Sequence, residues 1–151
     1  MINTSEILLL SCYEMGHQPV SLGWPLAALS EAGLAASAVD LSVDDFPTGV
    51  ASTARLVAIA APMHTALRLG VDAARRVRAL NPQAHITFYG LYAWLNGDYL
   101  LHSNGERAVA DSVIAGEYEG PLIALARAVN DGRAAAEVAG VSTPDRSAQP
   151  N

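Results

Sequence analysis

The side chains best suited to hold a ligand occur in four short segments, each of which follows an apolar run. They are Met15, Gly16, His17 and Gln18; Pro62, Met63, His64 and Thr65; Gly90, Leu91 and Tyr92; and Gly116 and Glu117. Imidazole, amide and carboxylate groups stand here among apolar and aromatic ones, a mixture that suits a large, flat, partly apolar ligand with polar groups around its edge. No nucleophile or acid is paired with a base in these segments, so we expect a binding site without catalytic residues.

The elements that must position these segments follow from the apolar patterning. Continuous apolar runs bounded by turn residues are typical of buried parallel strands. One such run follows Glu6, and others are predicted at 37–42, 55–63, 85–92 and 109–115. Helical spacing predicts helices at 21–33, 65–80 and 121–130, with short helices possible at 46–54 and 96–102. Leu67, Val71, Ala74 and Val77 should face the sheet, and Pro25 should lie in a first helical turn.

Strand and helix alternate about five times, which indicates an α/β fold with right-handed crossovers. We predict a flavodoxin-like (Rossmann-like), doubly wound sheet of five parallel strands in the order 2-1-3-4-5, within a three-layer αβα sandwich. Ligands of such sheets bind beyond the carboxyl ends of the strands, where the four segments would meet. We expect one domain over residues 1–132 and a linker or tail over residues 133–151, since S-T-P-D-R-S-A-Q-P-N has a loop composition.

Composition excludes several classes of partner. The formal net charge is −6 and every one of the nine basic residues is arginine, so the clustered positive charge that nucleic acids require is absent. Neither a basic amphipathic face for a membrane nor a secretory leader is recognisable. The single Cys12 cannot form an internal disulfide, which fits a reducing, cytoplasmic location.

The usual ligands of this fold fit poorly. A dinucleotide site needs G-x-G-x-x-G after the first strand, where Gly16 stands alone. Tyr13-Glu14-Met15 is not the hydroxyl-rich loop that a flavin mononucleotide site needs, and a phospho-accepting receiver needs a lysine that the chain lacks. A large, flat, partly apolar ligand suits these segments better, and cobalamin is one such ligand: its corrin ring would lie across the segments while its nucleotide tail enters a slot lined by small residues such as Ser11, Ala61 and Gly90.

The motifs I-L-L-L-S-C-Y-E-M-G-H-Q-P, A-P-M-H-T-A-L-R-L, F-Y-G-L-Y-A-W-L-N and I-A-G-E-Y-E-G coincide with these segments. Together they resemble the N-terminal cobalamin-binding domain of cobalamin-dependent radical S-adenosylmethionine (radical SAM) proteins, over nearly the whole chain up to Asp131. The resemblance implies a domain that holds cobalamin against a radical SAM domain, in cis or in trans, and that is not catalytic by itself. The 4Fe-4S cluster and S-adenosylmethionine would belong to that downstream domain, because one cysteine cannot supply three thiolates.

Cobalt ligation is a separate matter. Relatives such as methionine synthase use the histidine of D-x-H-x-x-G, but here Met15 replaces the aspartate and Val20 the glycine around His17. We therefore expect cobalamin without a histidine ligand and no protein ligand to the metal. Two alternatives stay open: another nucleotide-tailed ligand with His64 or Glu117 as the working group, or a small regulatory module.

Overall fold

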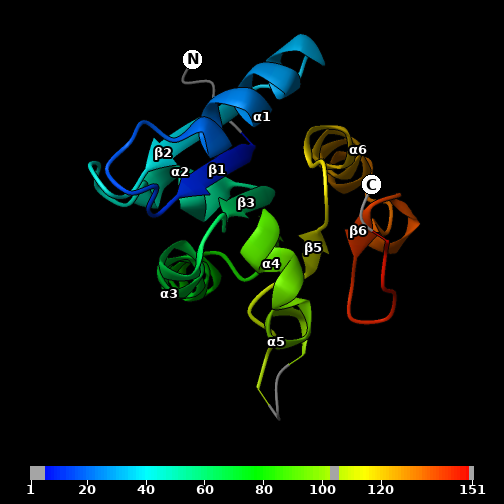
Figure 1. Cartoon of the computed structure of the whole chain (residues 1–151). Helices are drawn as coiled ribbons and strands as arrows, with labels where there is room; N and C mark the ends of the chain where they lie inside the picture. Colours follow the sequence, from blue (N-terminus) through cyan, green and yellow to red (C-terminus); the bar gives the residue numbers. More distant parts are fainter. Residues whose placement is uncertain (1–5, 103–105, 150–151) are drawn as a thin grey trace.

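A single mixed sheet forms the centre of the molecule. The computed structural model describes residues 6–102 and 106–149. Six strands lie in the order β2-β1-β3-β4-β5-β6, and all neighbouring pairs are parallel except β5 and β6 (Figure 1). The strands are β1 (Ile7–Ser11), β2 (Ala36–Asp40), β3 (Leu56–Ala60), β4 (His85–Tyr89), β5 (Ser112–Ile114) and β6 (Val141–Ser142).

Helices cover both faces of this sheet (Figure 1). They are α1 (Val20–Glu31), α2 (Thr48–Thr53), α3 (His64–Leu80), α4 (Leu91–Leu95), α5 (Gly97–Leu101) and α6 (Glu119–Asn130), with a 3-10 turn η1 (Ala135–Glu137). One core joins α1 and α6 to the sheet, and the other joins α2, α3, α4 and α5 to its opposite face. The predicted α/β class is confirmed, as are the four α3 residues expected to face the sheet, all of which are buried. Within the described residues, no helix is long and apolar enough to cross a bilayer.

The prediction of five strands was wrong, and the order 2-1-3-4-5 therefore describes only part of the sheet. β6 adds a sixth strand, antiparallel to β5, with Val113 opposite Ser142 and Ile114 opposite Val141. Part of the segment predicted as a linker or tail thus belongs to the sheet, and Val141 in it is fully buried. β6 shields the edge of β5, whose backbone groups would otherwise be open to another chain.

Two local predictions need correction. β4 ends at Tyr89 and the chain turns at Gly90, so Leu91 and Tyr92 begin α4 rather than extending the strand. Pro25 lies in the second turn of α1, not the first. A proline there removes the N–H that would bond to the carbonyl of Ser21, four residues earlier. The hydroxyl of the fully buried Tyr89 donates to this carbonyl instead, which joins the end of β4 to the start of α1.

A polar network links β4 and β5 near the start of both strands. Arg78 of α3 belongs to this network, because its Nη2 lies 2.7 Å from Asp111 Oδ2, which also accepts the N–H of Ile86. Next to this pair, His85 Nε2 lies 2.8 Å from Ser112 Oγ, and Ser112 in turn donates to Thr87 Oγ1. Buried polar groups on these strands are therefore largely satisfied by one another.

Candidate functional site

All four predicted segments lie at one edge of the sheet, beyond the carboxyl ends of β1, β3, β4 and β5; we call this the carboxyl edge. The first segment forms the turn between β1 and α1, and the second connects β3 to the first turn of α3. The third begins α4, and the fourth lies between β5 and α6. Exposed residues here are Met15, Gly16, His17, Gln18, His64, Thr65, Leu91, Gly116 and Glu117, while Pro62, Met63, Gly90 and Tyr92 are half-buried.

The second and third segments are in direct contact. The rings of His64 and Tyr92 meet edge to face, with centroids 6.3 Å apart. The N–H of Tyr92 donates to the carbonyl of Ala61 at 3.0 Å, and the N–H of Ala61 donates to the carbonyl of Tyr89 at 2.8 Å. These bonds hold His64 and Tyr92 side by side above β3 and β4.

The first segment faces a different neighbour. Gly16, His17 and Gln18 line a hollow of about 740 Å³ whose other walls come from the start of α1 and the end of β2. The remaining three segments do not line it. The structure therefore brings all the predicted residues to one edge, but it joins the first segment to β2 rather than to His64 and Tyr92.

Gly90 packs closely against the neighbouring strand end. Its backbone φ is +103°, a value that residues other than glycine rarely adopt. A Cβ at this position would lie 3.0 Å from the carbonyl carbon and oxygen of Ala61. Ser11 and Ala61 are also completely buried, or nearly so. No opening therefore lies between Gly90 and Ala61, two of the three residues predicted to line a slot for a nucleotide tail.

The helices that begin at this edge have unsatisfied backbone groups. The first N–H groups of a helix have no partner within the helix, and a side chain at the N-cap normally satisfies one of them. The N-cap residues of α1, α3, α4 and α6 are Pro19, Met63, Gly90 and Tyr118, and none makes a side-chain capping bond. Glu14 supplies one acceptor, since its Oε1 lies 3.3 Å from the N–H of Ser21. The hydroxyl of Ser21 is buried and has no partner among the described residues.

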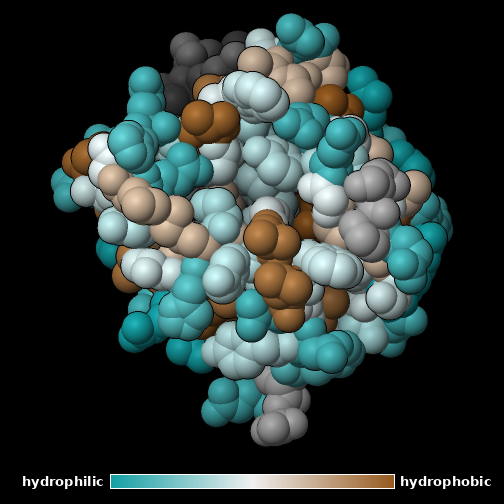
Figure 2. All heavy atoms as spheres, viewed as in Figure 1, coloured by the Kyte–Doolittle hydropathy of each residue, from teal (hydrophilic) through white to brown (hydrophobic). Residues whose placement is uncertain are grey.

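An apolar surface lies beside these polar groups. Leu91, Trp94 and Leu95 fall on one side of α4 and are 60%, 43% and 59% exposed. In Figure 2, hydrophobic residues gather at the centre of the visible face, over α4. Large exposed apolar side chains that cluster in this way mark surfaces for a ligand or a protein.

A tyrosine pair at this edge, with Tyr89 buried and Tyr118 half-buried, was not predicted from the sequence. The ring centroids of Tyr89 and Tyr118 are 4.6 Å apart, and the Tyr89 hydroxyl reaches the start of α1. Burial raises the pKa of both phenols, and the neighbouring acidic groups Glu14 and Glu119 raise them further. Both therefore stay protonated and can donate hydrogen bonds. The available clue was Pro25, which leaves a helix carbonyl that needs such a donor.

The described residues contain no group of three or more potential metal ligands. Cys12 is buried, and burial together with the charges of Asp40 and Asp72 raises its pKa to about 12. Its thiol is thus protonated at neutral pH, and because the thiolate is the reactive form, the side chain is chemically inert.

No protein-family model matches the chain, and no curated protein matches it in sequence. Two solved structures of the radical S-adenosylmethionine methyltransferase TsrM from Kitasatospora setae share its fold. One contains the tryptophan substrate and a SAM analogue, with 17% identity and a TM-score of 0.63; the other contains cobalamin and a [4Fe-4S] cluster, with 16% identity and a TM-score of 0.65. Each alignment covers 92% of this chain but only 28% or 29% of the methyltransferase. At this identity the likeness establishes a shared α/β fold, and the chain spans less than a third of the length of these proteins.

Proposed function

We propose that the chain is a cobalamin-binding domain that positions cobalamin for a radical SAM catalytic domain. The observation that carries this proposal is the carboxyl edge itself, where uncapped helix starts surround an exposed apolar surface. A corrin ring is large, flat and apolar on its faces, with amides around its rim. The fold shared with a methyltransferase whose structure contains cobalamin supports the same assignment.

The residues of this edge fit such a ligand in chemistry. Leu91 and Met15 offer apolar contact to the ring, while His64, Gln18 and Glu117 can exchange hydrogen bonds with its amides. The buried hydroxyl of Ser21 is a further group that lacks a partner among the described residues. When bound, cobalamin would supply a cobalt centre able to carry a methyl group, whereas the chain's own side chains hold and orient it.

We propose that no protein side chain ligates the cobalt. His17 is exposed in a turn, where its own backbone N–H donates to the carbonyl of Glu14. A histidine ligand is normally oriented by a partner on its second ring nitrogen, and Met15 stands where relatives have an aspartate.

The catalytic partner would lie in the same chain, beyond the cobalamin-binding domain, which was predicted to end at residue 132 but whose sheet extends to β6. The two methyltransferase structures are more than three times as long as this chain, which supports an arrangement in cis. Any shortened version for experiments should retain residues up to 149, because β6 belongs to the sheet.

Cobalamin retention tests the proposal directly. The protein is mixed with hydroxocobalamin, free ligand is removed by gel filtration, and bound ligand is read from its visible absorbance. We expect retention, with Leu91→Asp reducing affinity about tenfold or more by placing a charge under an apolar ring. The matched control is Leu80→Asp, since Leu80 is also an exposed leucine but lies at the last residue of α3, away from the carboxyl edge. A protein that stays colourless, or equal loss in both variants, would contradict the proposal.

The ligation proposal has its own readout. His17→Ala should retain cobalamin with an unchanged cobalt spectrum, whereas a shifted spectrum would mean that His17 is a ligand.

A further inference from the structure

The hollow beside the first segment has features that the proposed cobalamin site does not use. Its volume of about 740 Å³ lies within the range of roughly 300–1,000 Å³ typical of small-molecule sites. The segment after β1, the first two turns of α1, and the end of β2 with the segment after it line this open hollow, and Figure 1 shows the two segments side by side. Both an aromatic ring and a carboxylate line it, from Trp24 and Asp40.

Asp40 is the last residue of β2, the strand next to β1. Its Oδ1 accepts the N–H of Ser42 at 3.0 Å and the hydroxyl of Ser42 at 2.6 Å. Its Oδ2 accepts no hydrogen bond from the described residues. In dinucleotide-binding sheets an acidic residue some 20 residues beyond the first strand-to-helix turn accepts a ribose hydroxyl, and Asp40 lies at the corresponding place.

Trp24 lies on α1 and is 67% exposed, although it is one of the largest apolar side chains in the protein. An aromatic ring on the wall of a hollow offers a stacking surface for a flat base. The combination of a stacking ring and a carboxylate on one hollow matches the two parts of a nucleoside, the base and the sugar.

The start of α1 argues against a phosphate in this hollow. A dinucleotide fold holds its phosphate at this helix start. Here the carboxylate of Glu14 occupies it, with Oε1 bonded to the N–H of Ser21. Asp44 also lines the hollow, so a phosphate would meet negative charge there.

We propose that this hollow binds a phosphate-free ribonucleoside, with the base stacked on Trp24 and the ribose hydroxyls donating to Asp40. This inference goes beyond the proposed cobalamin function, because the other three segments of the carboxyl edge do not line the hollow.

Adenosine binding followed by tryptophan fluorescence tests it, in the whole chain and without cobalamin. The chain has two tryptophans, so the Trp94→Phe variant leaves Trp24 as the reporter. We expect saturable quenching by adenosine. Because the site is built to bond the ribose hydroxyls and to exclude phosphate, 2′,3′-dideoxyadenosine and AMP should each bind about tenfold more weakly or worse. Absence of saturable quenching, or equal affinity for all three compounds, would overturn the proposal.

Matched variants separate recognition from folding. Asp40→Asn keeps an oxygen for the turn at Ser42 but loses the charge, and it should weaken adenosine binding about tenfold. Asp45→Asn makes the same charge change on an exposed residue outside the hollow and should leave affinity unchanged. Thermal unfolding of both variants shows whether they are folded. Equal affinities in Asp40→Asn and the parent protein would exclude the assigned role of Asp40.

Discussion

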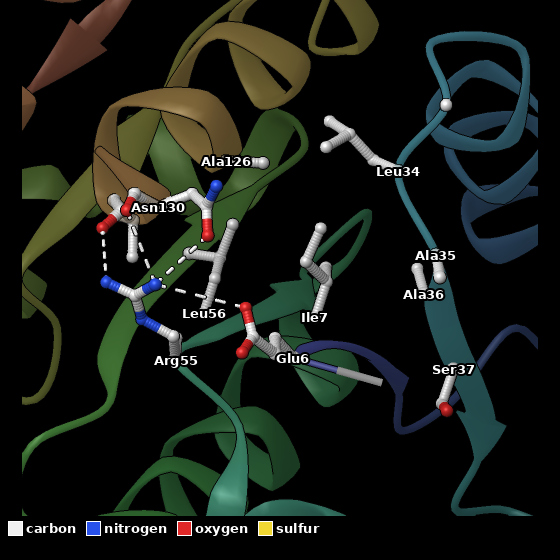
Figure 3. Close-up of a pocket in the computed structure, with 12 residues that line it drawn as sticks. Glu6, Ile7, Leu34, Ala35, Ala36, Ser37, Arg55, Leu56, Ala126 and Asn130 are labelled. Atoms are coloured by element: carbon white, nitrogen blue, oxygen red, sulfur yellow. Dashed lines mark hydrogen bonds and ion pairs between the residues drawn. The ribbon is translucent and has the colours of Figure 1, made fainter. Parts of the chain in front are cut away.

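The helix termini at the two ends of the sheet differ in how their backbone groups are hydrogen-bonded. At the carboxyl edge the helix starts carry no N-cap side chain, and apolar and polar groups are exposed together. At the other end, which we call the amino edge, arginines donate to the last carbonyls of α1 and α6. Arg55 donates to the carbonyls of Val129 and Asn130 at the end of α6 (Figure 3), and Arg127 donates to that of Ala32 at the end of α1.

A hollow of about 420 Å³ also lies at the amino edge, but its character differs. Figure 3 shows Arg55 turned toward Asn130 and Glu6. The apolar side chains of Ile7, Leu34 and Leu56 also line this hollow. The cationic group there is engaged by the protein itself. In a doubly wound sheet all helix starts gather at one edge and all helix ends at the other. The comparison indicates that this chain stabilises helix ends at the amino edge and leaves helix starts and apolar side chains exposed at the carboxyl edge.

The largest expected effect concerns Gly90, which is tightly packed although it lies at the exposed carboxyl edge. Gly90→Ala should lower the free energy of unfolding by about 2–5 kcal/mol, since it combines backbone strain with overpacking against Ala61. Gly16→Ala is the control, because Gly16 also has a positive φ but a Cβ there meets nothing within 4 Å. It should cost only about 1–2 kcal/mol. Urea unfolding measures both, and equal losses would mean that the contact with Ala61 is unimportant.

The amino edge should respond in stability and not in binding. Arg55→Met removes the hydrogen bonds to Val129 and Asn130, and because Arg55 is half-exposed we expect a loss of about 1–2 kcal/mol. Arg68→Met, on the exposed side of α3, should be nearly neutral. Cobalamin retention should be equal in both. A lower affinity in Arg55→Met would break the division between the two edges.

A histidine near the amino edge should make stability depend on pH. Burial lowers the pKa of His85 below its ordinary value of 6.5, an effect that exceeds the opposing charge of Asp111. The unfolded chain therefore binds this proton more readily than the folded one. The contribution of neutral His85 to the free energy of unfolding is fully present above pH 6.5. It is lost as the pH falls from there through the lower pKa of the folded state. Urea unfolding between about pH 5 and 8 should show this loss, and His85→Gln should reduce it; an unchanged pH profile would contradict the assignment.

The smallest effect on stability should come from the exposed carboxyl edge. Leu91→Asp, the variant expected to lose cobalamin, should change the free energy of unfolding by no more than about 0.5 kcal/mol, since Leu91 is 60% exposed. A large loss of stability would mean that the apolar surface of α4 is structural, and the retention experiment would then need a milder substitution such as Leu91→Ser.

The sequence predicted the parts of this molecule that depend on long apolar runs. The strands β1 and β3, the buried face of α3 and the gathering of the four segments at one edge all follow from periodicity and the order of elements. β6 could not be predicted, because a strand of two residues has no periodicity and its pairing depends on the free edge of β5. The close contact between Gly90 and Ala61 was missed for a similar reason: small residues at these two positions indicate close packing or an opening equally well, and only the distance between the strand ends decides.

The hydrogen bond between the Tyr89 hydroxyl and the carbonyl of Ser21 constrains the evolution of the sequence. Proline at position 25 makes a hydroxyl at position 89 necessary, and without the proline the helix would satisfy that carbonyl itself. Tyr89→Phe alone would leave a buried acceptor unpaired, whereas Pro25→Ala together with Tyr89→Phe would not. Positions 25 and 89 should therefore covary among homologous sequences, although 64 positions separate them along the chain.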